Sequence, residues 1–217
     1  TSSAVNIGAN ISFEDDAPRV AALSVDSATA VTLDETVGTR SGDTNAATDD
    51  YSTVTSYGTP MGRAAADFLS LGGTTNYGTD GAASGAAAAV YALKLGATTG
   101  VDAGVTTTDG YKVYLFENTT THVIEGREAT VAGDAGLASS TGAVVFTVEI
   151  NAGSGEVTVT QYQSLHQPTG GASSPDEAVA LTAGALQATV TIQDGDGDTL
   201  TSSAVNIGAN ISFEDDA

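Results

Sequence analysis

The first seventeen residues of the chain, 1–17, recur letter for letter as residues 201–217, an offset of 200 positions. Identity over such a stretch does not arise by chance, so we expect the parent protein to carry near-identical tandem units. The period is far longer than the roughly 20–50 residues of a solenoid repeat. Each unit is therefore predicted to be a domain of its own. Residues 1–17 would be the C-terminal end of the preceding repeat, and residues 18–217 one complete repeat.

The composition and patterning favour an all-β domain. Aromatic residues make up only 6% of the chain, and Ala, Val, Thr, Ser and Gly dominate it. The β-branched residues among these suit pleated surfaces. Val90–Leu95 and Tyr111–Phe116 alternate with the period of a strand, whereas Ala64–Leu71 fits either a short helix or a strand.

The clearest hairpin pairs Ala143–Ile150 with Glu156–Tyr162 across a glycine-containing loop. Further strands are predicted in segments bounded by Gly, Pro, Asn and Asp turns: Arg19–Val25, Ala30–Leu33, Thr121–Arg127, Leu186–Ile192 and, within residues 1–17, Ala4–Ile7 and Asn10–Phe13. Residues 38–62 are predicted to form a long polar loop. About ten to twelve short strands favour an Ig-like β-sandwich, one per repeat, because two sheets then cover each other's apolar faces.

The charge balance excludes several classes of partner. Six basic residues stand against 27 acidic ones, giving a net charge of −21. No basic footprint for nucleic acid or anionic lipid is present. No apolar run approaches the ~20 residues of a membrane span, so direct membrane insertion is not expected. The chain has no Cys, which leaves metal ions as the expected alternative to disulfides in a secreted protein.

Asp194, Asp196 and Asp198 alternate with glycines, so their carboxylates can turn toward one point. Ca²⁺ accepts six to eight hard oxygen ligands in flexible geometry. The run fails the EF-hand pattern, because Thr199 stands where that loop needs Gly and Val205 where it needs Glu. A solvated Asp-Gly turn is the alternative interpretation.

Carboxylates also gather at the predicted unit boundary. Glu14, Asp15 and Asp16 are consecutive, and their copies are Glu214, Asp215 and Asp216. Without cations these charges would repel one another and loosen the joint. Asp34 and Glu35 are expected to meet them from the domain that follows the boundary. We therefore predict a Ca²⁺ site at the junction, with an exposed strand-end turn as the alternative for Asp34 and Glu35.

Enzyme activity is not expected. His122 and His166 are the only histidines, no nucleophile motif accompanies them, and they lack zinc-type spacing. Both are predicted to be surface residues. Pairs of acids such as Glu117 with Glu125 occur in any acidic β protein, so they do not indicate glycoside hydrolysis.

Four motifs together carry a family resemblance: Val31–Thr36, Gly155–Tyr162, Asp194–Thr199 and Ile211–Ala217. In this order they resemble the large tandem repeats of giant type I-secreted RTX adhesins, the biofilm-associated, Bap/LapA-like proteins of Gram-negative bacteria. The resemblance implies an Ig-like extender domain, stiffened by Ca²⁺ and stacked in many copies. Such a stalk would hold a terminal adhesive domain away from the bacterial surface, in the extracellular space.

Two functions from different classes follow. In the first, the unit is a structural spacer whose partners are neighbouring repeats of the same chain, while surface glycans would be reached through other domains of the parent. In the second, each unit is a weak carbohydrate- or surface-binding module, and the array supplies avidity. An exposed, coplanar patch of Tyr side chains would favour the second function, since a spacer needs none.

Overall fold

The computed structural model describes residues 1, 3–35, 53–98, 100–168 and 177–214. Nearly all regular structure in these ranges is β-strand, and none of it is α-helix, which confirms the all-β prediction. Three single turns of 3₁₀ helix interrupt the strands: η1 (Gly8–Asn10), η2 (Gly85–Ala88) and η3 (Gly208–Asn210). None of the helical turns described is long or apolar enough to cross a membrane. The predicted loop 38–62 lies largely outside the described residues.

The largest sheet has six antiparallel strands in the order β3-β10-β9-β8-β7-β6. Their bounds are β3 (Gly62–Ala66), β6 (Val101–Thr106), β7 (Lys112–Glu117), β8 (Ile124–Glu128), β9 (Val144–Ile150) and β10 (Val157–Gln161). The predicted hairpin is confirmed as β9–β10, with Val148 opposite Val159. Its loop closes on Gly155, whose φ of 85° is a conformation that glycine adopts without strain.

Strand β12 (Leu186–Gln193) organises a second sheet. It pairs along one edge with β5 (Ala89–Leu95) and along the other with β13 (Thr199–Thr201) and β14 (Val205–Asn206). The side chains of β12 alternate between buried and half-buried positions, as period-two patterning predicts for a strand with one face in the core.

Two smaller sheets complete the fold. In the first, β1 (Leu23–Val25) pairs with β4 (Leu69–Leu71). The segment Ala64–Leu71 therefore contains the end of β3 and the whole of β4, and no helix. In the second, β15 (Ile211–Glu214) lies between β11 (Ala178–Ala180), which is antiparallel to it, and β2 (Val31–Asp34), which is parallel to it. The last described strand is therefore a central strand of its sheet.

One continuous apolar core connects these sheets. The rings of Phe146 on β9 and Phe213 on β15 contact each other at its centre, with centroids 5.1 Å apart. Gly126 on β8 makes room for this pair, because a Cβ added there would lie 2.5 Å from the Phe146 ring. The last strand is thus held to the large sheet by aromatic packing.

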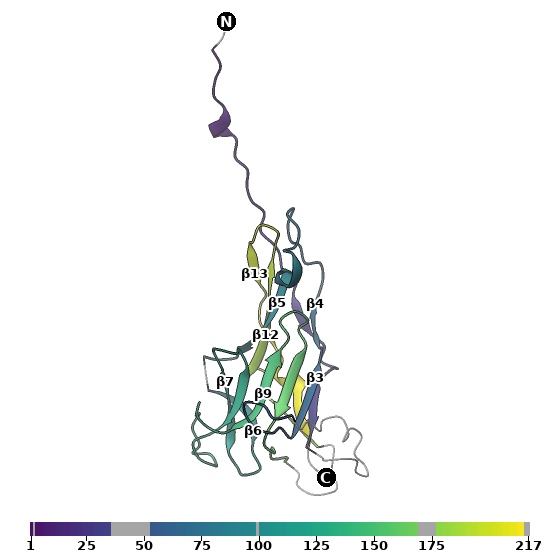
Figure 1. The fold of residues 1–217 in the computed structure, drawn as a ribbon, viewed down its shortest axis with the longest axis vertical. Coiled ribbons are helices and arrows are strands. Elements are labelled where there is room, and N and C mark those ends of the chain that lie inside the picture. Colours follow the sequence, from purple (N-terminus) through teal and green to yellow (C-terminus); the bar gives the residue numbers. More distant parts are fainter. Residues whose placement is uncertain (2, 36–52, 99, 169–176, 215–217) are drawn as a thin grey trace.

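The molecule is elongated, and its N-terminal segment projects from one end of the long axis (Figure 1). Strand β13 lies at that end, whereas the yellow strand β15 lies toward the opposite end of the body (Figure 1). The chain therefore enters the domain at one end and reaches its last described strand toward the other.

The two copies of the duplicated sequence differ in structure. The C-terminal copy forms β14 and β15, as expected, but the prediction of strands over Ala4–Ile7 and Asn10–Phe13 is wrong for the N-terminal copy, where neither segment is a strand. A strand needs a ladder partner, and in the described structure the N-terminal copy has none. Likewise, Thr121–Arg127 is a strand only from Ile124, and His122 lies between the preceding turn and this strand.

The duplication supplies a matched pair of core and surface substitutions. Phe213 is completely buried, whereas Phe13 is 94% exposed in the same sequence context. Phe213→Ala is expected to lower the free energy of unfolding by about 3–5 kcal/mol, because it leaves a cavity against Phe146. Phe13→Ala should change it by less than about 0.5 kcal/mol. Chemical denaturation of both variants measures the difference, and equal effects would contradict this packing.

Candidate metal centre

The chain segment that enters the domain is hydrogen-bonded to the loop 76–83. Arg19 and Asn76 exchange two backbone hydrogen bonds, from Arg19 N to Asn76 O at 2.6 Å and from Asn76 N to Arg19 O at 3.0 Å. The adjacent Pro18 is buried. The entry to the domain is thus fixed at residues 18–19.

Asp16 strengthens this attachment. Its Oδ2 accepts a hydrogen bond from the backbone N–H of Thr79 at 2.7 Å, and its Oδ1 accepts one from Thr79 Oγ1 at 3.0 Å. The carboxylate lies over Gly78, where an added Cβ would be 2.6 Å from Asp16 Oδ2. Only glycine permits this approach, so both oxygens of Asp16 are positioned by the loop.

The turn 193–198 is bound to the other side of the same loop. Gly195 N donates to Gly81 O at 2.8 Å, and Ala83 N donates to Gln193 O at 3.0 Å. A Cβ on Gly195 would lie 2.5 Å from the backbone oxygen of Asp80, so this contact also requires glycine. Three segments distant in the sequence, residues 15–19, 76–83 and 193–198, therefore converge at the end from which the N-terminal segment projects.

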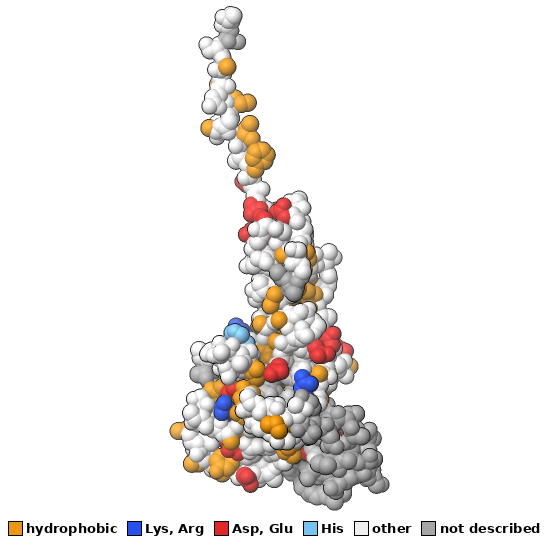
Figure 2. All heavy atoms as spheres, viewed as in Figure 1, with side chains coloured by type: hydrophobic (Ala, Val, Ile, Leu, Met, Phe, Trp, Pro, Cys, Tyr) orange, Lys and Arg blue, Asp and Glu red, His pale blue; other side chains and the backbone are white. Residues whose placement is uncertain are grey.

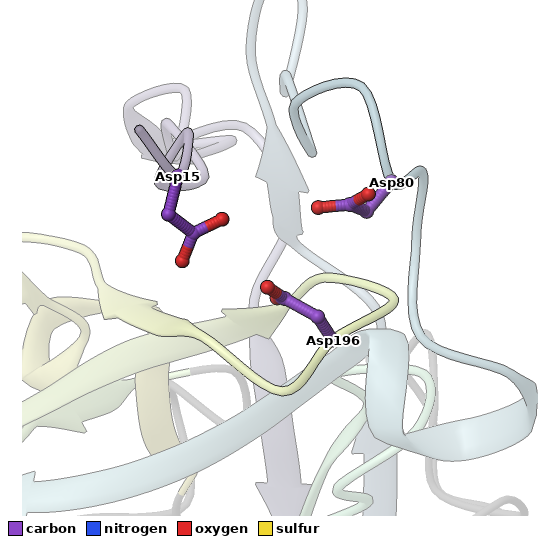
Figure 3. A group of neighbouring side chains, drawn as sticks. All are labelled: Asp15, Asp80 and Asp196. Carbon is purple, nitrogen blue, oxygen red and sulfur yellow. The ribbon is translucent and has the colours of Figure 1, made fainter. Parts of the chain in front are cut away.

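Each of these segments contributes a carboxylate to one cluster. An oxygen of Asp15, one of Asp80 and one of Asp196 all lie within 4.8 Å of one another, and the three side chains point toward a common space (Figure 3). Acidic side chains are visible where the slender N-terminal segment joins the body (Figure 2). Within the described part of the chain, no basic side chain forms an ion pair with these three aspartates.

Asp194 is the buried member of the same turn, with 1% of its surface exposed. Its Oδ1 accepts hydrogen bonds from the backbone N–H groups of Asp198 at 2.8 Å and Gly197 at 3.1 Å. Its Oδ2 is buried and has no hydrogen-bond partner. One oxygen of Asp194 lies within 4.8 Å of oxygens of Asp196 and Asp198, so the three alternating aspartates do turn toward one point.

The electrostatics of this end favour a positive ligand. Burial raises the pKa of Asp80, and the negative charges of Asp196, Asp16, Asp15 and Asp194 raise it further. Burial and the neighbouring Asp196 carboxyl also raise the pKa of Asp194, against the opposing effect of the two backbone N–H groups. Both shifts mean that the folded chain disfavours the ionised carboxylates in the absence of a cation.

Ca²⁺ matches the spacing of these oxygens. It binds oxygen ligands at about 2.3–2.6 Å, so two ligands of one ion lie at most about 5 Å apart. Asp15, Asp80 and Asp196 satisfy this limit, and so do Asp194, Asp196 and Asp198. Asp196 belongs to both sets and could bridge them. The arrangement offers several carboxylate oxygens to one or two hard cations.

The other predicted ligands lie elsewhere. Asp34 and Glu35, at the end of β2, are buried next to β15 and not beside Asp15; Asp34 is in register with Glu214, and Glu35 N donates to Glu214 O at 3.4 Å. The carboxylate of Glu35 accepts hydrogen bonds from Gln161 Nε2 and from Leu165 N.

The acids at the ends of the two copies of the duplicated sequence differ in where they lie. Glu14 is exposed and belongs to neither group of converging carboxylates. Asp215 and Asp216 lie outside the described residues. Of the nine predicted ligands that lie in the described residues, five converge at the end where the chain enters: Asp15, Asp194, Asp196 and Asp198 in the carboxylate groups, and Asp16, which is hydrogen-bonded to the adjoining loop.

Asp80 was missed by the sequence analysis. Its local signal is weak: one acid in a Gly-rich stretch, followed by Gly81. Its role depends on the antiparallel bridge between Ala82 and Asp194, which carries the loop to the aspartate turn. A contact between residues so far apart in the sequence cannot be read from local composition.

A second feature is an apolar groove of about 750 Å³ between β5 and the ends of the large sheet. Tyr57, Tyr91, Glu117, His122 and Glu149 are among the residues that line it. Tyr57 is tilted by 59° against Tyr162 and donates its hydroxyl to Glu125 at 2.7 Å, so these two rings are not a coplanar platform. Both histidines are exposed, as predicted, and His122 Nδ1 lies 3.0 Å from Glu117 Oε1.

The loop contact at Asp16 can be tested with two glycines of similar backbone conformation. Gly78 has a φ of +78° and Gly81 a φ of +75°, but only a Cβ on Gly78 would meet Asp16. Both alanine variants should lose about 1–2 kcal/mol to backbone strain. Gly78→Ala should in addition release Asp16 and mobilise residues 12–17, as measured by backbone NMR relaxation. Equal mobility in the two variants would contradict a fixing role for the Asp16 contact.

Comparison with known proteins gives one result beyond this geometry. No curated protein and no solved structure gives a significant match to the chain. A family model described as a domain of unknown function, DUF5801, matches residues 30–208. This match covers most of the chain, including β2, the Asp80 loop and the aspartate turn. The chain therefore belongs to the DUF5801 family.

Proposed function

We propose that this domain is a structural spacer of a large bacterial surface adhesin, made rigid by Ca²⁺ where consecutive units join. Its role is to hold a terminal adhesive domain at a distance from the cell, for attachment to surfaces and within biofilms. Its partners are the neighbouring repeats, with residues 1–17 as the end of the preceding unit and 18–217 as one complete unit. The domain is no enzyme in this proposal, and it acts outside the cell after type I secretion.

One observation carries the proposal. The acids that converge come from the entering segment and from two loops of the body, so a cation bound between Asp15, Asp80 and Asp196 would bridge the linker and the domain. The buried Asp194 Oδ2, which lacks a donor, supplies an independent reason for a cation. An ion at this position would replace repulsion between the segments with shared coordination, and thereby restrict their relative motion.

The overall shape agrees with a spacer role. The chain enters at one end of an elongated body, and its last described strand lies toward the other end (Figure 1). Units joined in this way extend the array and do not fold back on each other. The resemblance of the aspartate turn and of Ile211–Ala217 to RTX adhesin repeats supports the same assignment, and an Ig-like β-sandwich is the architecture we propose for the unit.

The alternative is a weak carbohydrate-binding module that acts by avidity. The groove lined by Tyr57 and Tyr91 is the feature that favours it. A glycan array probed with the full chain distinguishes the two functions. Reproducible binding that Tyr91→Ala abolishes would favour the alternative, whereas a spacer binds none of the glycans.

Ca²⁺ is expected to raise the melting temperature of the full chain. At a free concentration of about 100 times Kd, a ligand of the folded state adds about 2.7 kcal/mol, which corresponds to about 5–10 °C for a chain of this size. Differential scanning calorimetry with Ca²⁺ and with EDTA measures the shift. Identical melts under the two conditions would exclude a Ca²⁺ site that stabilises the fold.

Asp80→Asn separates a metal ligand from a merely structural residue. In EDTA the variant should melt at the same temperature as the natural chain or higher, because it removes a carboxylate whose pKa is raised by its neighbours. In Ca²⁺ the variant should melt at a lower temperature than the natural chain, because a ligand is missing. Most of the rise in melting temperature that Ca²⁺ gives the natural chain should then be lost. Asp109→Asn, at an exposed position in a different loop, is the matched control and should keep the full gain. If Asp80→Asn lowers the melting temperature by the same amount with and without Ca²⁺, Asp80 is not a ligand.

Two consecutive units test the spacer function itself. Small-angle X-ray scattering of a chain in which residues 18–217 are followed by a second copy of 18–217 should show a greater maximum dimension and less flexibility in Ca²⁺ than in EDTA. The same chain with Asp80→Asn in the second unit should resemble the EDTA state under both conditions. Unchanged profiles for the natural sequence would contradict a Ca²⁺-rigidified joint.

A further inference from the structure

One sequence is present here in two environments. Apolar side chains of the N-terminal copy are exposed, with 61% of Ile7 and 94% of Phe13 accessible, and Val5 and Ile11 are exposed as well. Their counterparts Ile207, Ile211 and Phe213 are completely buried, and Val205 packs against the core. Four large apolar groups on a single extended segment are costly in water. The segment is therefore incomplete without a partner that covers it.

The structure also shows which surface covers this sequence. The amide of Asn210 donates to Asp26 O at 3.0 Å and to Thr29 O at 2.8 Å. Ser212 Oγ lies 2.9 Å from Thr32 Oγ1, in the ladder between β15 and β2. These contacts are specific to the side chains of the duplicated sequence.

The backbone and ring contacts complete the site. Leu181 N donates to Ile211 O at 3.1 Å, and Gln167 Nε2 donates to Phe213 O at 3.2 Å. The Phe213 ring packs on Phe146. We call this surface, formed by β2, β11 and the core around Phe146, the strand site. Because residues 4–14 are identical to 204–214, they carry every group that the strand site recognises.

The exposed copy already has the local conformation of the buried one. Gly8–Asn10 and Gly208–Asn210 both form one turn of 3₁₀ helix, with Ile11 N bonded to Gly8 O and Ile211 N bonded to Gly208 O. The residues after the turns are extended alike, with φ, ψ of −113°, 115° at Ile11 and −120°, 117° at Ile211. Docking therefore requires little change in this part of the segment, which lowers its entropic cost.

We propose that residues 4–14 are a strand donor that fills the strand site of a second copy of this fold. The donor is added between β11 and β2 as a central strand, with Ile7, Ile11 and Phe13 in the core. This interaction surface goes beyond the spacer function, because it requires no metal ion and allows a segment of one chain to complete the fold of a separate chain. Within an array, the same residues are the last strands of the preceding unit.

Geometry requires the exchange to occur between copies. Asp16 is bound to Thr79 at the end of the body where the N-terminal segment projects, whereas β15 lies toward the opposite end (Figure 1). Glu14 and Asp16 are two positions apart in the chain, so their Cα atoms lie at most about 7 Å from each other. The donor thus cannot reach the strand site of its own body while Asp16 is docked. Repetition of a contact between unlike surfaces builds a head-to-tail chain.

In the natural chain the tethered C-terminal copy occupies the strand site, so the test must displace it. Ile211→Asp together with Phe213→Asp places two charges where the core admits none, and leaves the donor at residues 4–14 intact. The full chain with these changes should assemble in EDTA, and its mass by analytical ultracentrifugation should rise from that of one chain, 21.4 kDa, to at least twice that value. Addition of Ile11→Asp and Phe13→Asp removes the donor and should abolish the assembly.

A synthetic peptide of residues 1–17 provides the second measurement. In excess, this peptide should convert the assemblies into complexes of one chain with one peptide. The same peptide with Phe13→Asp should bind with a Kd at least about a hundredfold higher. If circular dichroism shows that the chain with Ile211→Asp and Phe213→Asp is unfolded, the natural peptide should restore its β-sheet signal and a cooperative thermal unfolding transition.

Two results would overturn the proposal. In the first, the chain with Ile211→Asp and Phe213→Asp is folded and monomeric and binds no peptide. In the second, the same chain is unfolded and stays unfolded with saturating peptide. Because every measurement is made in EDTA, failure here leaves the Ca²⁺ proposal standing, and failure of the melting experiment leaves strand donation standing.

Discussion

The burial of Ile211 and Phe213 is the interaction on which the rest of the chain depends. Both side chains are completely enclosed, and they place the last strand between β11 and β2, against the Phe146 ring. The parallel pairing with β2 brings Glu214, the last residue of β15, beside Asp34 and Glu35, away from the entry of the chain. The packing of this strand therefore determines that the chain enters the domain at one end and that its last described strand lies toward the other.

The opposite end of the body poses an electrostatic problem. Glycines at 78 and 195 allow three segments to approach so closely that Asp15, Asp80 and Asp196 share one space. A proton could neutralise one carboxylate of this group, but it leaves the others unpaired, and the chain offers no basic side chain to them in its described part. A divalent cation can bind all three at once. Steric fit therefore brings the charges together, and a shared divalent cation is the ligand that we propose for them.

Local patterns predicted the strands better than they predicted the site. Alternation in Val90–Leu95 identified a real strand, because the exposure of its side chains differs between the two faces at every second residue. The β9–β10 hairpin was identified as well, although every residue of β10 is buried. The aspartate turn was also recognisable, since its three acids are local. Asp80 was not, and Asp34 lies beside Glu214 and not beside Asp15, because both placements depend on which strands pair across the fold. The N-terminal copy shows the limit most directly: the same letters form a strand only where β11 and β2 receive them.

In the duplicated sequence, the residues that form the last strand of a unit are followed directly by the acids at the unit boundary. Glu14 would end a core strand of one unit, and Asp16 is already docked on the next, so almost no free chain separates the two folds in the proposed array. Tension along the array would then act on β15 parallel to its ladders with β2 and β11, where the hydrogen bonds lie across the pull and are loaded together. The same tension would reach the acid cluster of the next unit directly, through Asp15. In the proposed array, a cation at that cluster would reinforce the junction at the point where the strand gives no further support. The strand site and the acid cluster would then be two successive parts of one mechanical connection.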